Sequence, residues 1–180
     1  YEGGQQKEGV VRPDEIYNAT NGSPNRFYLN EGGFRFRDAT KECGFDVGVR
    51  RMTLAASWED FDADGDPDLY VANDFGPNCL YRNEGGKFTE VAAELGAEDP
   101  STGMSVSWGD VNRDGRFDAI VGNMFSAAGN RVTSQKQFRK ELREDLDVER
   151  VRYLARGNTF LVNQGAKFSE ESESSGIINT

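Results

Sequence analysis

Two short stretches of the sequence place side-chain oxygens at alternating positions, a pattern that suits the binding of a hard divalent cation. Each has Asp or Asn at positions one, three and five, glycine at position six and aspartate at position nine. Calcium takes about six to eight oxygen ligands, and flexible carboxylates supply them. The sequence therefore predicts two calcium sites. The predicted side-chain ligands are Asp60, Asp62, Asp64 and Asp68 in the first loop, and Asp110, Asn112, Asp114 and Asp118 in the second.

Position seven of each loop is expected to offer its backbone carbonyl rather than its side chain. It is Asp66 in the first loop and Arg116 in the second, and an arginine side chain is not a calcium ligand. A solvated acidic turn without metal is the alternative interpretation. Two copies in register, fifty residues apart, favour the metal, because a cation offsets the repulsion between crowded carboxylates.

The two loops differ in charge, which predicts a difference in affinity. Residues 59–68 hold six acidic residues and no basic one, whereas residues 110–118 hold three acidic residues and two arginines. Attraction of a cation should therefore be stronger at the first loop.

An EF-hand would also fit the first six positions, but the residues after each loop exclude it. An EF-hand needs glutamate at position twelve and helices on both sides. Position twelve is Val71 in the first loop and Val121 in the second, and both loops run into β-branched and aromatic residues. Such residues are typical of strands, so each loop is expected to join two strands.

Three further segments share one hairpin pattern, at residues 25–40, 78–93 and 158–173. Each reads as Asn, a short apolar strand, a second Asn, a glycine-containing turn and a strand with Phe. Asn and Gly tolerate the positive φ that tight hairpin turns need. Trp58 and Trp108 lie two residues before the first aspartate of each loop and are expected to pack in the core.

These pieces combine into a unit of four antiparallel strands in about fifty residues, the size of one β-propeller blade. The expected fold is all-β, a partial propeller of about two and a half blades with a small helical insertion. The predicted segments are a polar lead-in (1–24), a half blade with connector (25–52), and blades at 53–103 and 104–180.

The insertion, residues 133–156, has a helical period instead of a strand period. Phe138, Leu142 and Leu146 are spaced by four residues, and Val151 and Leu154 by three. A second short helix is expected to start near residue 147 and to end at residue 157. A solvated flap and a partner-binding element are both open interpretations of this segment.

Composition narrows the classes of function. The 180 residues carry a net charge of −10, which makes nucleic acid an unfavourable partner, and include no apolar run long enough to span a membrane. Without histidine, Ser-His-Asp and Cys-His catalysis and imidazole ligation of zinc are excluded. Cys43 and Cys79 are expected either to form one disulfide or to be two buried thiols.

The pattern Asp-x-Asp-x-Asp-Gly-x-x-Asp between strands of a repeated blade resembles the FG-GAP and VCBS repeats. These repeats form the calcium-binding β-propeller of integrin α subunits and of many secreted bacterial proteins. The phrases "SWEDFDADGDPDLYVAN", "NEGGKFTEVA" and "ARGNTFLVNQG" are similar to the cartilage-acidic-protein-like group, often associated with an ASPIC/UnbV region. The Phe-Gly and Gly-Ala-Pro signatures of the family are degraded here.

The resemblance implies that calcium is structural and that the ligand positions are those of the family. These positions are Asp60, Asp62, Asp64, Asp66 and Asp68, and Asp110, Asn112, Asp114, Arg116 and Asp118. It also implies a protein that is extracellular, periplasmic or at the cell surface. The expected role is non-catalytic recognition, adhesion or scaffolding, with a protein or glycan ligand.

Two further expectations concern function and the extent of the fold. The alternative function is the propeller portion of a secreted polysaccharide-acting enzyme, since paired carboxylates for glycoside hydrolysis are not excluded by composition. The chain is also expected to be a segment of a longer propeller. Its outer faces would then be covered by the remaining blades of the same propeller or by other copies.

Overall fold

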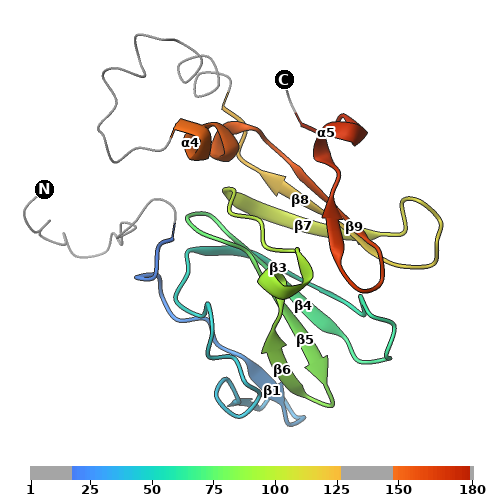
Figure 1. Cartoon of the computed structure of the whole chain (residues 1–180). Coiled ribbons are helices and arrows are strands. Elements are labelled where there is room, and N and C mark those ends of the chain that lie inside the picture. The colour runs from blue at the N-terminus through green and yellow to red at the C-terminus, as the bar shows by residue number, and fades with distance from the viewer. Residues whose placement is uncertain (1–17, 127–147, 179–180) are drawn as a thin grey trace, which may run out of the picture.

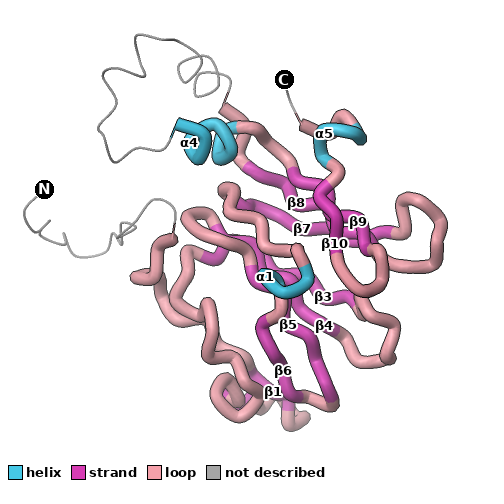
Figure 2. Tube along the Cα trace, viewed as in Figure 1, coloured by secondary structure: helices cyan, strands magenta, loops and turns pink. Residues whose placement is uncertain are grey.

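The protein is an all-β structure of antiparallel sheets with a few short helices, as the computed structural model of residues 18–126 and 148–178 describes it (Figure 1). The strands, shown in Figure 2, form one two-stranded and two four-stranded sheets. The amino-terminal hairpin consists of β1 (Tyr28–Asn30) and β2 (Phe36–Asp38). The first sheet consists of β3 (Thr53–Glu59), β4 (Asp68–Asn73), β5 (Cys79–Glu84) and β6 (Lys87–Glu90). The second sheet consists of β7 (Gly103–Gly109), β8 (Asp118–Asn123), β9 (Thr159–Asn163) and β10 (Phe168–Glu170).

The two four-stranded sheets are copies of one design. In each, sequential strands are neighbours and all pairs are antiparallel. Both also have a register shift at the start of the first strand, at Thr53/Ala55 and at Gly103/Ser105. The prediction of four antiparallel strands per repeat unit is therefore confirmed. The strand edges of the two sheets lie side by side, with β7 against β3 and β4 (Figure 1).

Glycines reverse the chain where the hairpins require it. Gly85 and Gly86 connect β5 to β6 with φ of 62° and 85°, a left-handed conformation that costs glycine little. The strands end sooner than expected, because one helical turn follows each outer strand. These turns are α1 (Ala92–Leu95) and α5 (Ser172–Ser175), and each ends at a left-handed glycine, Gly96 or Gly176.

Two apolar cores hold the sheets together. The core between the first and second sheets includes Phe61, Tyr70, Leu161 and Phe168. The core between the amino-terminal hairpin and the first sheet includes Phe45, Tyr81 and Phe88, with Phe27 packed against it. Burial of this apolar surface is the main favourable term that fixes the three sheets relative to one another.

The two tryptophans occupy equivalent strand positions but differ in burial. Trp108 packs against the core between the two sheets, with its ring 6.0 Å from that of Tyr70. Trp58 contacts Phe27 and Phe88, yet its side chain is 47% exposed. The prediction of core packing is therefore correct for Trp108 and wrong for Trp58, because the described residues cover only one side of Trp58.

The second helix of the insertion is present as α4 (Val148–Ala155), and Gly157 follows it with φ of 96°. Tyr153 anchors this helix by donating its hydroxyl to Asp99 Oδ1 at 3.4 Å, and Arg156 Nη2 donates to the same hydroxyl at 2.6 Å. The first predicted helix, around Phe138 to Leu146, lies outside the described residues.

The cysteine alternatives are also decided. Cys43 and Cys79 are both buried free thiols. Among the described residues, no helix combines the length and apolar character needed to cross a membrane.

Candidate metal centre

The two acidic loops join strands of one sheet, as expected. Residues 60–68 lie between the end of β3 and the start of β4, and residues 110–118 lie between β7 and β8. Strands, not helices, flank both loops, so the exclusion of an EF-hand is correct. In Figure 1 both loops project from the same side of the molecule.

The first aspartate of each loop organises the backbone of that loop. Asp60 accepts the backbone N–H groups of Asp64 at 3.1 Å and Gly65 at 3.0 Å, through its two carboxylate oxygens. Gly65 has a φ of 97°, a conformation that favours glycine over residues with a β-carbon. The Asp60 carboxylate therefore fixes the turn of the loop through hydrogen bonds to the protein backbone alone.

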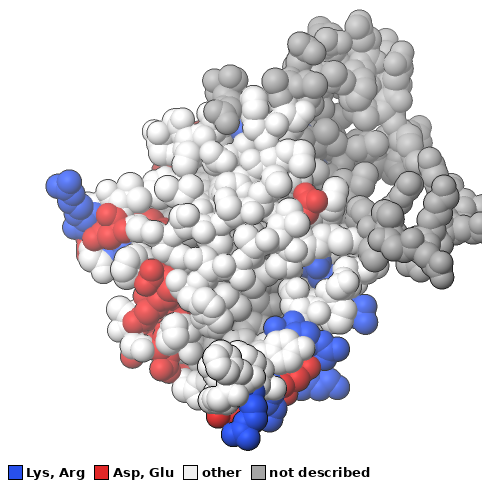
Figure 3. All heavy atoms as spheres, turned by 180° about the vertical axis from the view of Figure 1, so that it is seen from behind, with Lys and Arg blue, Asp and Glu red and all other residues white. Residues whose placement is uncertain are grey.

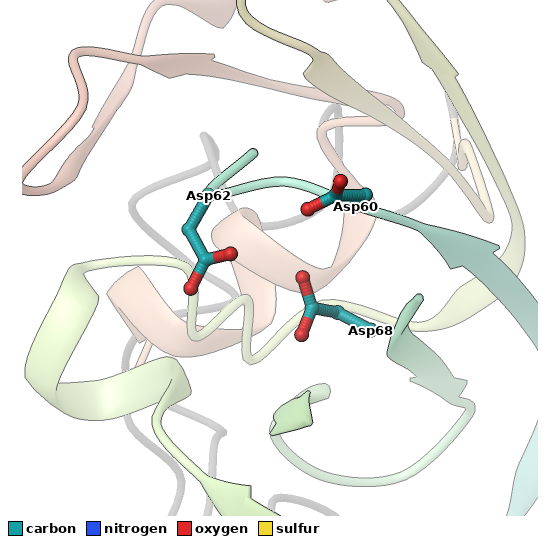
Figure 4. Close-up of side chains that lie close together, drawn as sticks. All are labelled: Asp60, Asp62 and Asp68. Carbon is teal, nitrogen blue, oxygen red and sulfur yellow. The ribbon is translucent and has the colours of Figure 1, made fainter. Parts of the chain in front are cut away.

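Three carboxylates of the first loop converge on one point. Asp60, Asp62 and Asp68 each offer an oxygen, and these oxygens lie within 4.8 Å of one another. Figure 4 shows the three side chains directed toward a common space, two from the loop and one from the start of β4. A cluster of oxygen donors at this spacing fits a hard cation such as calcium.

Asp68 is the fixed member of this cluster. It is fully buried, and its carboxylate accepts the backbone N–H of Phe61 at 3.0 Å and of Asn83 at 2.8 Å. Burial raises the pKa of Asp68 to about 6, although the two backbone hydrogen bonds favour the charged form. Burial also raises the pKa of Asp62, and the neighbouring charge of Asp64 adds to this rise. In both cases the main cause is removal of the carboxylate from water, which disfavours its charged form.

The remaining predicted ligands of the first loop have other contacts. Asp64 Oδ1 accepts the backbone N–H of Asp66 at 2.8 Å. Asp66 Oδ2 accepts the backbone N–H of Gly85 at 2.7 Å, so this side chain turns toward the β5–β6 turn. The role of the Asp66 backbone carbonyl as a metal ligand stays a prediction.

The second loop repeats the backbone but not the cluster. Asp110 accepts the backbone N–H groups of Asp114 and Gly115, both at 3.0 Å. Asp118 is fully buried and accepts the backbone N–H of Val111 at 3.1 Å and of Asn163 at 2.9 Å. Within residues 18–126 and 148–178, the only group of three clustered acidic ligands is the one in the first loop.

Position three accounts for the missing cluster, because Asn112 replaces the carboxylate that Asp62 supplies in the first loop. Arg116 adds a second difference. Its Nη2 donates to Asp114 Oδ2 at 2.6 Å, and Asn112 Nδ2 donates to the same oxygen at 3.0 Å. Burial raises the pKa of Asp114, but hydrogen bonds from the Arg116 backbone and from Asn112, with the charge of Arg116, outweigh it and leave the pKa lowered. One predicted ligand of the second loop thus already has an internal cation beside it.

The charge distribution on the surface agrees with this contrast. Seen from behind, acidic side chains gather on the edge that carries the two loops (Figure 3). Basic side chains lie among them at loop 110–118, the upper of the two loops in this view. The lower end of the molecule, where the amino-terminal hairpin lies, mixes both charges. The ion pairs there include Arg26 with Asp38 and Arg37 with Glu42.

Sequence reasoning missed the hairpin asparagines as part of the site. Asn83 and Asn163 were expected only to form turns, yet their backbone N–H groups bind Asp68 and Asp118. It also missed Phe61, whose ring is buried between the two sheets. The recurrence of Asn at one position of each hairpin was the available signal.

Residues 60–121 match the family model described as the FG-GAP-like repeat. The matched segment begins at the first aspartate of the first loop and ends within β8, so it includes both acidic loops. The resemblance to the FG-GAP repeat inferred from the sequence is therefore confirmed for this segment.

The chain is also similar to cartilage acidic protein 1. It is 32% identical over 117 residues to the protein of Mus musculus and 32% identical over 119 residues to that of Homo sapiens. Each match covers 64% of this chain and 17% of the relative. A match of 58 residues to the Xenopus tropicalis protein is 40% identical and covers 31% of this chain and 9% of the relative. The chain therefore spans less than a fifth of the length of these relatives.

Proposed function

We propose that this chain is a calcium-binding module of a β-propeller, with a non-catalytic recognition, adhesion or scaffold role outside the cell. The convergence of Asp60, Asp62 and Asp68 within 4.8 Å carries this proposal. The FG-GAP-like match over the same loop supports it, and an extracellular location is in keeping with relatives named for cartilage. The partner recognised outside the cell is a protein or a glycan.

The module binds two calcium ions of unequal affinity. The tighter site is loop 60–68, where buried Asp68 and two further carboxylates face a common point. The weaker site is loop 110–118, where calcium must compete with Arg116 for Asp114. Asp110, Asn112 and Asp118 supply the other side-chain oxygens of that site.

Calcium in these loops has a structural role, because its binding stabilises the folded state. Asp68 connects the loop to the β5–β6 hairpin through Phe61 and Asn83, so a cation at Asp68 stabilises all three segments. At a free calcium concentration about a hundredfold above Kd, binding to the folded state alone adds about 2.7 kcal/mol to the free energy of unfolding.

The sheets are blades, and the outer face of the amino-terminal hairpin is a blade contact. Phe36, Phe88 and Phe168 face the equivalent hairpin asparagine in their respective sheets. The preceding sheet or hairpin covers Phe88 and Phe168, which are buried, whereas Phe36 is 61% exposed. Tyr28 on the same face is 54% exposed. Further blades of the same propeller, or other copies, cover this face.

A hollow beside the amino-terminal hairpin bears on the alternative function. It has a volume of about 640 Å³ and is lined by three carboxylates, Asp38, Glu42 and Asp46. Asp38 is paired with Arg26 and Glu42 with Arg37, so these two carboxylates are engaged in ion pairs. Glycoside hydrolysis needs two carboxyl groups across the scissile bond. A polysaccharide-acting enzyme remains the alternative function.

Calcium titration of decalcified protein tests the proposal. We expect two binding events by calorimetry, with loss of the tighter one in Asp62→Ala and of the weaker one in Asp114→Ala. Glu98→Ala, an exposed acidic residue outside both loops, is the matched control and should change neither event. Absence of calcium binding, or retention of both binding events in Asp62→Ala and in Asp114→Ala, would refute the calcium role. Release of reducing sugar ends from a polysaccharide panel would favour the enzyme instead.

A further inference from the structure

Asn163, at the end of β9, contacts both acidic loops although one of them belongs to the other sheet. Its side chain is 1% exposed. Its Nδ2 donates to the backbone carbonyl of Phe61 at 2.8 Å, a contact between residues 102 positions apart. Its backbone N–H donates to Asp118 Oδ1 at 2.9 Å. One buried residue therefore joins loop 60–68 to loop 110–118.

The connection continues into each predicted site. On one side, the peptide N–H of Phe61 donates to Asp68 Oδ2 at 3.0 Å. On the other side, Arg116 Nε donates to the Asn163 carbonyl at 3.0 Å, and Arg116 also holds Asp114. Asp68 and Asp118 are fully buried, so the hydrogen bonds that they accept from Phe61 and Asn163 are shielded from water and are costly to break. The Arg116–Asp114 contact, in contrast, is exposed.

Apolar packing supports the same junction. The Phe61 ring lies 5.7 Å from that of Phe168, on the strand that pairs with β9. Phe61 is 5% exposed and belongs to the core shared by the two sheets. The second residue of loop 60–68 is thus inserted between the sheets, and its position depends on the geometry of that loop.

Asn83 shows that the bridge is specific to Asn163. It occupies the equivalent place at the β5–β6 hairpin, and its backbone N–H binds Asp68 as that of Asn163 binds Asp118. Its side chain, however, donates to the Pro67 carbonyl of its own sheet at 3.0 Å. Asn83 therefore supports one loop and connects to no second loop.

We propose that Asn163 couples the two loops, so that a cation in loop 60–68 raises the cation affinity of loop 110–118. This inference rests on the proposed calcium function. Ligation of Asp68 fixes the Phe61 peptide, whose carbonyl holds Asn163, which in turn orders Asp118 and Arg116. Part of the ordering cost of the second loop is then met before its own cation binds. By reciprocity the second cation tightens the first site by the same factor.

The sign of the effect separates this route from simple electrostatics. Coulomb repulsion between two bound cations weakens the second binding event. The hydrogen-bonded bridge strengthens it. We expect loop 110–118 of the wild-type chain, with loop 60–68 filled, to bind calcium about fivefold or more tightly than in Asp62→Ala, the lower end of typical coupling.

Substitution of the bridge tests the route, with calorimetry on the 180-residue chain. The affinity ratio is the calcium affinity of loop 110–118 with loop 60–68 filled, divided by its affinity when Asp62→Ala is present. In Asn163→Ala this ratio should fall to about one. In Asn83→Ala, the matched control, the ratio should be retained. Asn163→Asp, which keeps the side-chain shape but loses the donor to Phe61, should behave as Asn163→Ala and serves if the alanine variant does not fold.

Amide hydrogen exchange provides a measurement that needs only the first site. In Asp114→Ala, calcium should slow exchange over residues 159–170, and this effect should vanish when Asn163→Asp is added. Three outcomes would overturn the coupling alone. The first is calcium binding at loop 60–68 without slower exchange. The others are an affinity ratio of one with Asn163 present, and a ratio above one that survives in both Asn163 variants. Absence of any calcium binding would instead overturn the proposed function, and the coupling with it.

Discussion

Loop 60–68 and loop 110–118 have the same backbone design but different side-chain chemistry. In both, the first aspartate accepts the N–H groups of positions five and six. In both, the buried ninth aspartate accepts the N–H of position two and of a hairpin asparagine. The loop scaffold is therefore built from the shared spacing of two aspartates and is insensitive to charge at the other positions.

The difference lies at position three, where Asn112 replaces Asp62, and at position seven. Asp66 accepts the N–H of Gly85, whereas Arg116 donates to the carbonyl of Asn163. Both contacts tie the loop to the hairpin of its own sheet, with opposite hydrogen-bond polarity. Arg116 in addition pairs with Asp114. One scaffold thus allows a loop either to depend on an external cation or to balance part of its charge internally.

The largest expected effect comes from removing the buried aspartates. Asp68→Ala leaves the buried N–H groups of Phe61 and Asn83 without their acceptor, at about 1–3 kcal/mol each. Asp118→Ala should cost a similar amount in chelator, because it leaves two N–H groups in the same state. In saturating calcium, Asp68→Ala should lose more stability than Asp118→Ala. Denaturant unfolding with and without calcium measures this, and equal losses in calcium would remove the distinction between the loops.

Calcium removal should have the next largest effect. Excess chelator should lower the free energy of unfolding of the wild-type chain by about 2.7 kcal/mol relative to calcium at a hundredfold above Kd. In thermal unfolding, chelator should destabilise Asp62→Ala much less than it destabilises the wild type. It should destabilise Asn112→Ala almost as much as the wild type. A melting temperature that chelator leaves unchanged would show that the calcium is not structural.

Arg116 should limit the affinity of the second loop. Arg116→Gln removes the ion pair with Asp114, although Asn112 still donates to Asp114 Oδ2. It should raise the calcium affinity of loop 110–118 by up to about fivefold, the upper range for an exposed ion pair. Arg113→Gln is the control, because it removes the same charge from the same loop without touching that pair. If both variants gain affinity equally, net charge and not the Arg116 contact sets the difference between the loops.

The smallest effect concerns pH in the calcium-free protein. Burial raises the pKa of Asp68 from 3.8 to about 6, so the folded state binds this proton more tightly than the unfolded state. Its contribution to stability is full below about pH 4 and is lost as pH rises through about 6. In the absence of calcium, the free energy of unfolding of the wild type minus that of Asp68→Asn should therefore be larger at pH 5 than at pH 7.5. With saturating calcium the trend should reverse, because the cation needs the ionised carboxylate. A difference between the two proteins that is independent of pH would contradict the buried charge at Asp68.

Much of the fold was predictable because its signals are local. The aspartate spacing, the β-branched and aromatic residues of the strands and the turns that contain Asn and Gly each lie within a few residues, and all are found where the sequence places them. The short helices α1 and α5 were missed, since four residues are too few to show a helical period. The glycine that ends each of them was a usable signal.

The sequence by itself determined the repeat, the strands and the identity of the loop carboxylates, since turn chemistry and the strand preference of β-branched and aromatic residues act along the chain. The tertiary structure decided which of those carboxylates converge, that Arg116 reaches Asp114, and that Trp58 is half exposed while Trp108 packs. It also decided that Asn163 bridges two loops from opposite sheets. These outcomes depend on how one sheet packs against the next, and the packing of distant segments leaves no periodic trace in the sequence.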